Sequence, residues 1–95
     1  MQEFNLLENF FDSIQDEPCI GSTHICLYMG LLHYFVQNNF KNPITIKRGE
    51  IMKIAKIGGI ATYHKCMKDL VSSGYILYQP SFHPGLGSLV DLRQI

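Results

Sequence analysis

The sequence predicts a mostly helical α+β fold, with four helices and a C-terminal two-stranded β-hairpin in 95 residues. Three observations support this prediction. Apolar residues recur every three or four positions in four separate segments, which is the spacing of one helix face. A glycine pair at positions 58 and 59 marks a turn between the third and fourth segments. Near the C-terminus apolar and polar residues alternate, as in a strand with one exposed face.

The first expected helix is amphipathic and acidic. Large apolar residues form a stripe in residues 3–15, namely Phe4, Leu7, Phe11 and Ile14, with Leu6 and Phe10 beside them. Pro18 ends the segment, because proline disfavours helix in the residue before it. Residues 1–17 carry five acids and no base, a net charge of −5. The helix could cover its own domain, residues 18–95, or pair with a second copy. The size of the stripe favours a homodimer.

The second expected helix is central. Ser22 and Thr23 suit its N-terminus, and apolar residues occupy most of its faces through about residue 38, so we expect it to be buried. Gly30 costs about 1 kcal/mol relative to alanine inside a helix, which indicates a close helix crossing. His24 and His33 lie on this helix. Since no cluster of ligands accompanies them, we expect partly exposed or hydrogen-bonded histidines rather than functional ones.

The second half of the chain predicts two short helices and the hairpin. A β-prone stretch at residues 44–46 precedes a helix that begins at Arg48 or Gly49 and ends near residues 56–58. The fourth helix runs from residue 61 or 62 to 73, and Gly74 follows where helix ends favour a left-handed residue. Residues 75–79 and 88–93 have the pattern of two strands, joined by a loop rich in proline and glycine.

This order of elements is that of a winged helix-turn-helix, in which one helix enters the DNA major groove. The fourth helix suits that role. Its inward residues, at offsets of three, four and seven, are Tyr63, Cys66, Met67 and Leu70. Its polar residues are left facing outward. Residues 41–68 carry seven bases and one acid, a net charge of +6, which favours a polyanionic partner.

The candidate DNA-contacting residues form three groups. Thr62 and His64, near the start of the fourth helix, can hydrogen-bond base edges or phosphates. Basic side chains that can neutralise phosphates are Lys47, Arg48, Lys53, Lys56, Lys65 and Lys68. The hairpin tip adds Ser81, His83 and Ser88 but no lysine or arginine, so we expect its contribution to be modest.

The segment RGEIMKIAKIGGIATYHKCMKDLVSSGYILYQPSFHPGLGSLVDL resembles small winged-helix proteins encoded on mobile elements of gut anaerobic bacteria. Over about residues 20–93 the chain is similar to winged-helix DNA-binding domains of bacterial regulators and replication initiators. The most specific portion is TYHKCMKDL, followed by GYI. The resemblance implies a sequence-specific double-stranded DNA-binding protein, either a transcriptional regulator or a replication or transfer accessory factor. It puts Thr62, His64, Lys65 and Lys68 where the recognition helix meets DNA.

Other functions have less support in the sequence. The cysteines and histidines lack the paired spacing of zinc sites, and neither a Cys–His nucleophile set nor a phosphate loop is evident. We therefore predict no enzyme activity, no metal and no cofactor. No apolar run reaches the ~18 residues of a membrane span, and three cysteines without framework spacing predict a reduced, cytoplasmic protein. The main alternative is a winged-helix protein–protein interaction module without DNA binding, supported by the zero net charge.

Overall fold

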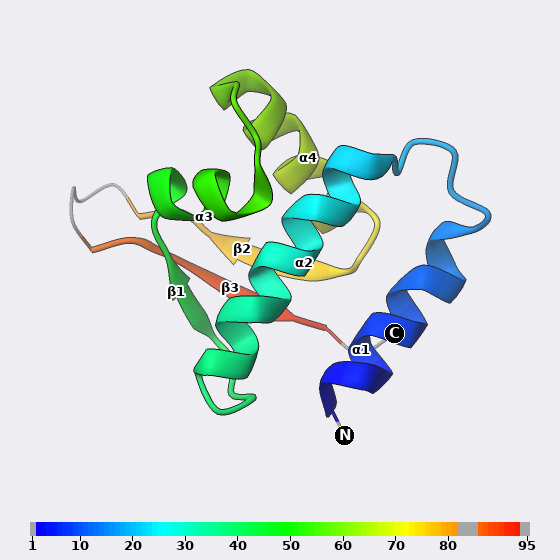
Figure 1. Ribbon diagram of the computed structural model, residues 1–95, viewed down its shortest axis with the longest axis horizontal. Helices are drawn as coiled ribbons and strands as arrows, with labels where there is room; N and C mark the ends of the chain where they lie inside the picture. Colours follow the sequence, from blue (N-terminus) through cyan, green and yellow to red (C-terminus); the bar gives the residue numbers. More distant parts are fainter. Residues whose placement is uncertain (1, 82–85, 94–95) are drawn as a thin grey trace.

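The described residues, 2–81 and 86–93, form four helices and a three-stranded antiparallel sheet in this computed structural model (Figure 1). The elements in chain order are α1 (Gln2–Ile14), α2 (Ser22–Gln37), β1 (Ile44–Ile46), α3 (Arg48–Ala55), α4 (Ile60–Ser72), β2 (Ile76–Gln79) and β3 (Ser88–Leu92). The predicted α+β fold is therefore confirmed, and each helix lies where its apolar periodicity placed it. Of the predicted contact residues, His83 lies outside the described residues.

The sheet has three strands, whereas the sequence predicted a two-stranded hairpin. β3 is the central strand and pairs with β2 on one side and β1 on the other. The side chain of Asn42 extends the β1–β3 pairing. Its Nδ2 donates to the carbonyl of Leu92 (2.8 Å), and the amide of Leu92 donates to its Oδ1 (3.0 Å). Because this side-chain amide replaces a backbone peptide in the ladder, a strand of only three residues is held in register.

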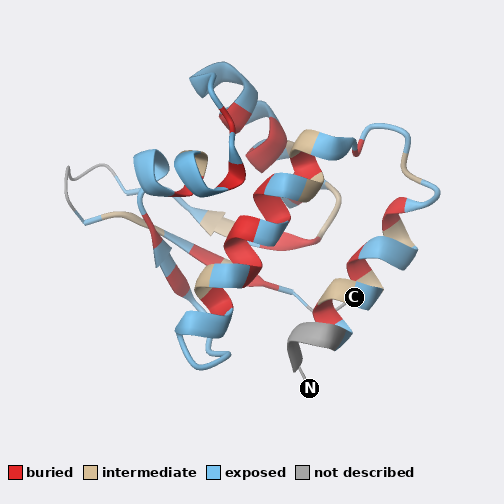
Figure 2. Cartoon of the chain, in the orientation of Figure 1, coloured by how far each residue is buried: buried red, intermediate tan, exposed pale blue. Residues whose placement is uncertain are grey.

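The central helix α2 crosses α3 closely, as Gly30 predicted. A Cβ built on Gly30 would lie 3.0 Å from Cδ1 of Ile51, closer than carbon atoms normally approach. Glycine therefore allows the two helices to pack without displacing the fully buried Ile51 side chain. Buried stretches of α1, α2 and the sheet face one another, while the first turns of α4 are largely exposed (Figure 2).

The helix α1 packs its apolar side on its own chain. The ring of Phe10 stacks on Tyr28 with centroids 3.9 Å apart, and it meets the edge of Tyr75 at 5.1 Å. Phe10 and Leu6 are buried, whereas Phe11 is 36 % exposed, so the buried face is rotated from the expected stripe. The apolar surface that favoured a homodimer is thus used within the chain, which leaves that prediction without its main support.

A single carboxylate fixes the end of α1 against the turn that follows α4. Glu17 accepts hydrogen bonds from the hydroxyl of Tyr75 (2.9 Å) and from that of Ser73 (3.0 Å). Burial and then Glu17 raise the pKa of Tyr75 to about 12. The N-terminal segment is therefore joined to the core by aromatic stacking and by charge-assisted hydrogen bonds.

Candidate nucleic-acid interface

The helix α4 has one face in the core and one in solvent. The inward residues predicted from sequence are all buried, namely Tyr63, Cys66, Met67 and Leu70. The exposed residues at offsets of four, seven and eleven from Ala61 form an outer stripe, which consists of Ala61, Lys65, Lys68 and Ser72. A molecule that approaches α4 from outside therefore meets two ammonium groups on one helical surface.

A hollow of about 320 Å³ separates this outer stripe from strand β2. Its lining includes His64, Lys68 and Ser72 from α4, and Tyr78 from β2. Two predicted contact residues, His64 and Lys68, thus share a surface with the hairpin. The core-facing spacing of Tyr63, Tyr75 and Tyr78 predicts that they pack between helix and hairpin, rather than form a stacking platform for single-stranded nucleic acid. Tyr63 and Tyr75 are buried, and Tyr78 is half-buried where β2 faces α4.

Hydroxyl groups meet at the junction of α4 with the hairpin. The hydroxyl of Tyr63 lies near that of Tyr78, and the hydroxyl of Tyr78 donates to that of Ser88 (3.5 Å). Burial, followed by the nearby Tyr78, raises the pKa of Tyr63, while the positive charge of Arg48 acts in the opposite direction. The start of α3 therefore lies near the same junction.

The opposite flank of α4 is tied to α2. His24 Nε2 lies 2.8 Å from Oδ2 of Asp69, and the ammonium of Lys65 lies 2.9 Å from the same oxygen. The backbone amide of Gly21 donates to Nδ1 of His24 (3.0 Å), so the neutral ring carries its proton on Nε2 and donates it to Asp69. The bond from His24, followed by that from Lys65, holds the pKa of Asp69 below its usual range.

This arrangement confirms that His24 is hydrogen-bonded, and it shows a partner that sequence reasoning missed. The i, i+4 spacing of Lys65 and Asp69 is a visible signal for an ion pair on a helix. By contrast, His24 and Asp69 are 45 residues apart, and nothing in the sequence pairs them. The charge of Lys65 is partly neutralised by Asp69, although its side chain remains 68 % exposed.

The other predicted basic residues are spread along α3. Lys47 is the residue before the helix, and Lys53 is exposed in its last turn. Lys56 follows the helix in a left-handed conformation, with φ of 62°. It lines a groove between α2 and α3 rather than the hollow beside the hairpin. The structure therefore groups Lys68 with the hairpin, keeps Lys65 on the same outer stripe but paired with Asp69, and places Lys56 in a different groove.

The remaining predicted contact residues differ in accessibility. Thr62 is exposed in the first turn of α4, and Ser81 is exposed after β2. Ser88 is half-buried, and its hydroxyl accepts a hydrogen bond from the backbone amide of Ser81 (3.3 Å). Ser88 therefore has a structural role at the base of the loop. The sequence predicts that Cys66 and Cys26 are both core thiols. Cys66 is buried, but the prediction for Cys26 is wrong, because its position on α2 is exposed, as is Cys19.

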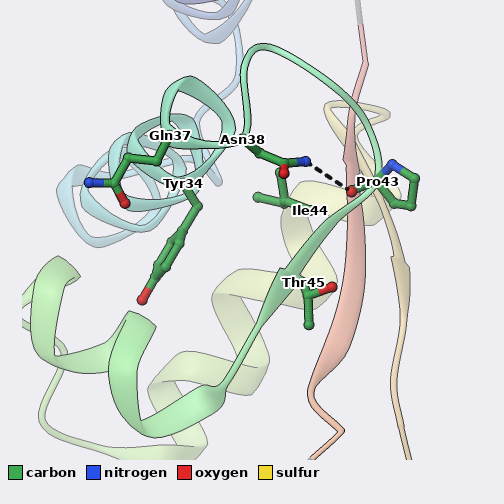
Figure 3. A pocket seen from close by; sticks show the side chains of 6 residues that line it. All are labelled: Tyr34, Gln37, Asn38, Pro43, Ile44 and Thr45. Carbon is green, nitrogen blue, oxygen red and sulfur yellow. Dashed lines mark hydrogen bonds between the residues drawn. The ribbon is translucent and has the colours of Figure 1, made fainter.

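A second hollow, of about 260 Å³, lies between the end of α2 and β1 (Figure 3). None of its lining residues is charged. Asn38 Nδ2 donates to the carbonyls of Lys41 (2.8 Å) and Pro43 (3.4 Å). Burial, followed by the nearby carboxylate of Glu50, raises the pKa of Tyr34. The side chain of Asn38 therefore holds the α2–β1 loop through its bonds to the two carbonyls.

Within residues 2–81 and 86–93, no group of three or more His, Cys, Asp or Glu side chains could hold a metal ion. No helix in the same ranges has both the length and the apolar character needed to cross a membrane.

The resemblance of the chain to winged-helix regulators stays a prediction from its sequence. No protein-family model matches the chain, and no match is found among curated proteins or among solved structures.

Proposed function

We propose that this chain is a cytoplasmic, sequence-specific double-stranded DNA-binding protein of the winged helix-turn-helix type. In this proposal α4 is the recognition helix and the β2–β3 hairpin is the wing. The observation that carries it is the outer stripe of α4, which presents Lys65 and Lys68 to solvent while the opposite face is anchored in the core. A helix presented in this way fits the major groove, and the adjacent hairpin can reach the flanking backbone.

The distribution of charge supports the same surface. The basic residues of α3 and α4 lie on one side of α2, and the acidic helix α1 lies on the other (Figure 1). Exposed Glu8 and Asp12 are on α1, so a polyanion bound at α4 would not approach them. The resemblance to mobile-element proteins adds the biological setting of the proposal, which is transcriptional regulation or accessory work in replication or transfer.

Titration of labelled duplex DNA at several salt concentrations tests the proposal. We expect the logarithm of the binding constant to fall linearly with that of salt, by about 0.9 per phosphate contacted. Lys68→Gln should reduce the magnitude of that slope by about 0.9, the value for one phosphate contact. Lys65→Gln should reduce it less, because the charge of Lys65 is already paired with Asp69. Lys41→Gln, an exposed lysine in the α2–β1 loop, is the matched control and should leave the slope unchanged.

Selection from a random duplex library then tests sequence specificity. An enriched motif that is lost with His64→Ala or Thr62→Ala would support base contacts from α4. No binding at low salt, or binding equally reduced by Lys41→Gln and Lys68→Gln, would count against the DNA surface.

A protein-interaction module is the second candidate, and the hairpin favours it. Leu77, Leu86 and Leu89 are 48 %, 66 % and 38 % exposed. No lysine or arginine occurs between residues 76 and 92. If duplex DNA does not bind at low salt, this apolar wing becomes the better-supported surface.

A further inference from the structure

The groove between α2 and α3 is lined mainly by apolar side chains, and Gly30 lies among them. The groove measures about 390 Å³, and its lining includes Cys26, Met29, Gly30, His33, Ile54 and Lys56. Met29 on one wall is 40 % exposed, and Ile54 on the other is 43 % exposed. Both side chains thus present apolar surface to solvent. The groove is separate from the hollow at α4 and the hairpin, and α3 and α1 lie on different sides of α2 (Figure 1).

The exposed side of α2 has no charged residue. None of the 16 residues of this helix is Asp, Glu, Lys or Arg. Among them Cys26, Met29, His33 and Val36 are exposed, at spacings of three or four residues. A helix at the surface normally carries charged residues on its outer face. Depletion of charge together with an exposed methionine is instead typical of the centre of a protein–protein interface.

The α3 side of the groove is positive. Lys56, which follows α3, lines the groove, and Lys53 is exposed in the last turn of that helix. Residues 47–56 carry four bases, Lys47, Arg48, Lys53 and Lys56, against one acid, Glu50, which is a net charge of +3. An occupant of the groove therefore meets apolar surface along its length and a net positive charge on the α3 side.

We propose that this groove binds an acidic amphipathic helix of a partner protein. The apolar stripe of that helix packs between Met29 and Ile54, and its carboxylates lie toward Lys53 and Lys56. Two packed helices form a valley that suits a third helix, which is the helix-in-groove mode of recognition. This proposal goes beyond DNA binding, because it assigns a second surface to a different class of partner.

The chain itself does not supply this helix. Its acidic amphipathic helix α1 already has Phe10 packed between Tyr28 and Tyr75. A second copy placed groove to groove would bring like charges of Lys53 and Lys56 together, which is unfavourable in a symmetric interface. A heterologous partner with acidic flanks is the occupant that matches both the apolar and the charged parts.

Titration of the isotope-labelled 95-residue protein with a synthetic helical peptide tests the proposal. The peptide is about 15 residues long, with leucines at offsets of four, seven and eleven and glutamates on the flanks. We expect saturable amide shifts at Met29, His33 and Ile54, and an affinity that falls with added salt. Two control peptides have the same leucine stripe with lysine flanks, or the same composition in scrambled order. Both should bind at least tenfold more weakly.

Variants of the protein make the test specific. Met29→Glu changes a half-exposed side chain, so the fold should survive, and peptide binding should be lost while DNA binding is unchanged. Lys53→Gln combined with Lys56→Asn should weaken peptide binding about fivefold, as expected for two exposed ion pairs. Asparagine is chosen because it tolerates the left-handed backbone of Lys56. Lys68→Gln is the matched control, and it should affect DNA binding only.

Three outcomes would overturn the proposal. The first is equal binding of the acidic and lysine-flanked peptides. The second is shifts that map to α4 or the hairpin rather than to the groove. The third is self-association, measured by sedimentation, that Met29→Glu abolishes, since a second copy would then occupy the groove. Failure of DNA binding in the unmodified protein would leave all three peptide results interpretable.

Discussion

The imidazole of His24 lies 2.8 Å from the carboxylate of Asp69 and thereby joins the first turn of α2 to the outer flank of α4. His24 is only 6 % exposed, yet its partner is half-buried and also holds Lys65. The position of the proposed recognition helix therefore depends on a hydrogen bond that reaches the N-terminus of the central helix. Because Gly21 supplies the other bond to the ring, both ring nitrogens are in use.

Replacing His24 should destabilise the protein much more than replacing an exposed histidine of the same helix. His24→Ala leaves the Gly21 amide without its side-chain acceptor and Asp69 without its nearest donor. We expect a loss of about 1–3 kcal/mol in the free energy of unfolding, measured by urea denaturation. His33→Ala is the control and should change it by less than about 0.5 kcal/mol. Equal effects would show that the His24 bonds contribute nothing to stability.

Asp69 should make the free energy of unfolding depend on pH in the acidic range. Its pKa is lowered in the folded protein, chiefly by the hydrogen bond from His24. A lowered pKa means that the contribution is fully present above the ordinary aspartate value of about 4 and is lost as the pH falls through the folded value. Urea midpoints measured across that range should therefore fall more steeply for the natural chain than for Asp69→Asn. Asp12→Asn, an exposed position on α1, should retain the steep dependence.

Removing a hydroxyl should have opposite effects at two buried tyrosines. Within the described residues the hydroxyl of Tyr28 is buried without a hydrogen-bond partner, and burial raises its pKa to about 12. Tyr28→Phe should therefore be neutral or stabilising by up to about 1 kcal/mol. Tyr75→Phe should cost about 1–3 kcal/mol, because it removes a hydrogen bond to the charged Glu17. Thermal or urea unfolding distinguishes the two, and a clear loss in Tyr28→Phe would indicate an unrecognised partner for that hydroxyl.

A methyl group at Gly30 should be unfavourable unless Ile51 is shortened. Alanine gains about 1 kcal/mol in helix propensity, but its Cβ would press on Cδ1 of Ile51, and overpacking a core costs about 1–3 kcal/mol. We expect Gly30→Ala to be destabilising by about 1 kcal/mol and the double variant with Ile51→Val to be more stable than the single one. Gly49→Ala is the control, since no atom lies within 4 Å of its added Cβ, and it should stabilise α3. Additive effects in the first pair would show that the contact is not tight.

The local features of this fold could be read from the sequence, whereas the contacts between distant residues could not. Apolar periodicity placed α4 and its buried Tyr63 and Cys66, because that pattern depends only on neighbouring turns of one helix. The same pattern misplaced the buried face of α1. Phe10 rather than Phe11 fills the space beside Tyr28, and only the shape of the core decides between adjacent phenylalanines. Similarly, the pairing of β1 with β3 depends on Asn42, whose partner is 50 residues away.

In the candidate site too, local features could be predicted from the sequence and contacts between distant residues could not. The outer stripe of α4 was predicted, since helical spacing alone sets Lys65 and Lys68 opposite the buried residues. The neutralisation of Lys65 by Asp69 and the departure of Lys56 toward α2 required the packed structure. Charge counted along the chain therefore overstated how many cations share one surface.

The packing of Phe10 between Tyr28 and Tyr75 has a consequence for experiments on fragments of this protein. A fragment that starts at residue 18 would leave two aromatic rings bare, together with Tyr75 and Ser73 hydroxyls that had lost the Glu17 carboxylate. Such a fragment should bind hydrophobic dyes and precipitate, and its behaviour would then say little about DNA. The last described residue at the other end lies beside the same rings, because the amide of Arg93 donates to the carbonyl of Tyr75 (3.1 Å), so a tag at either end should be separated from the domain by a spacer.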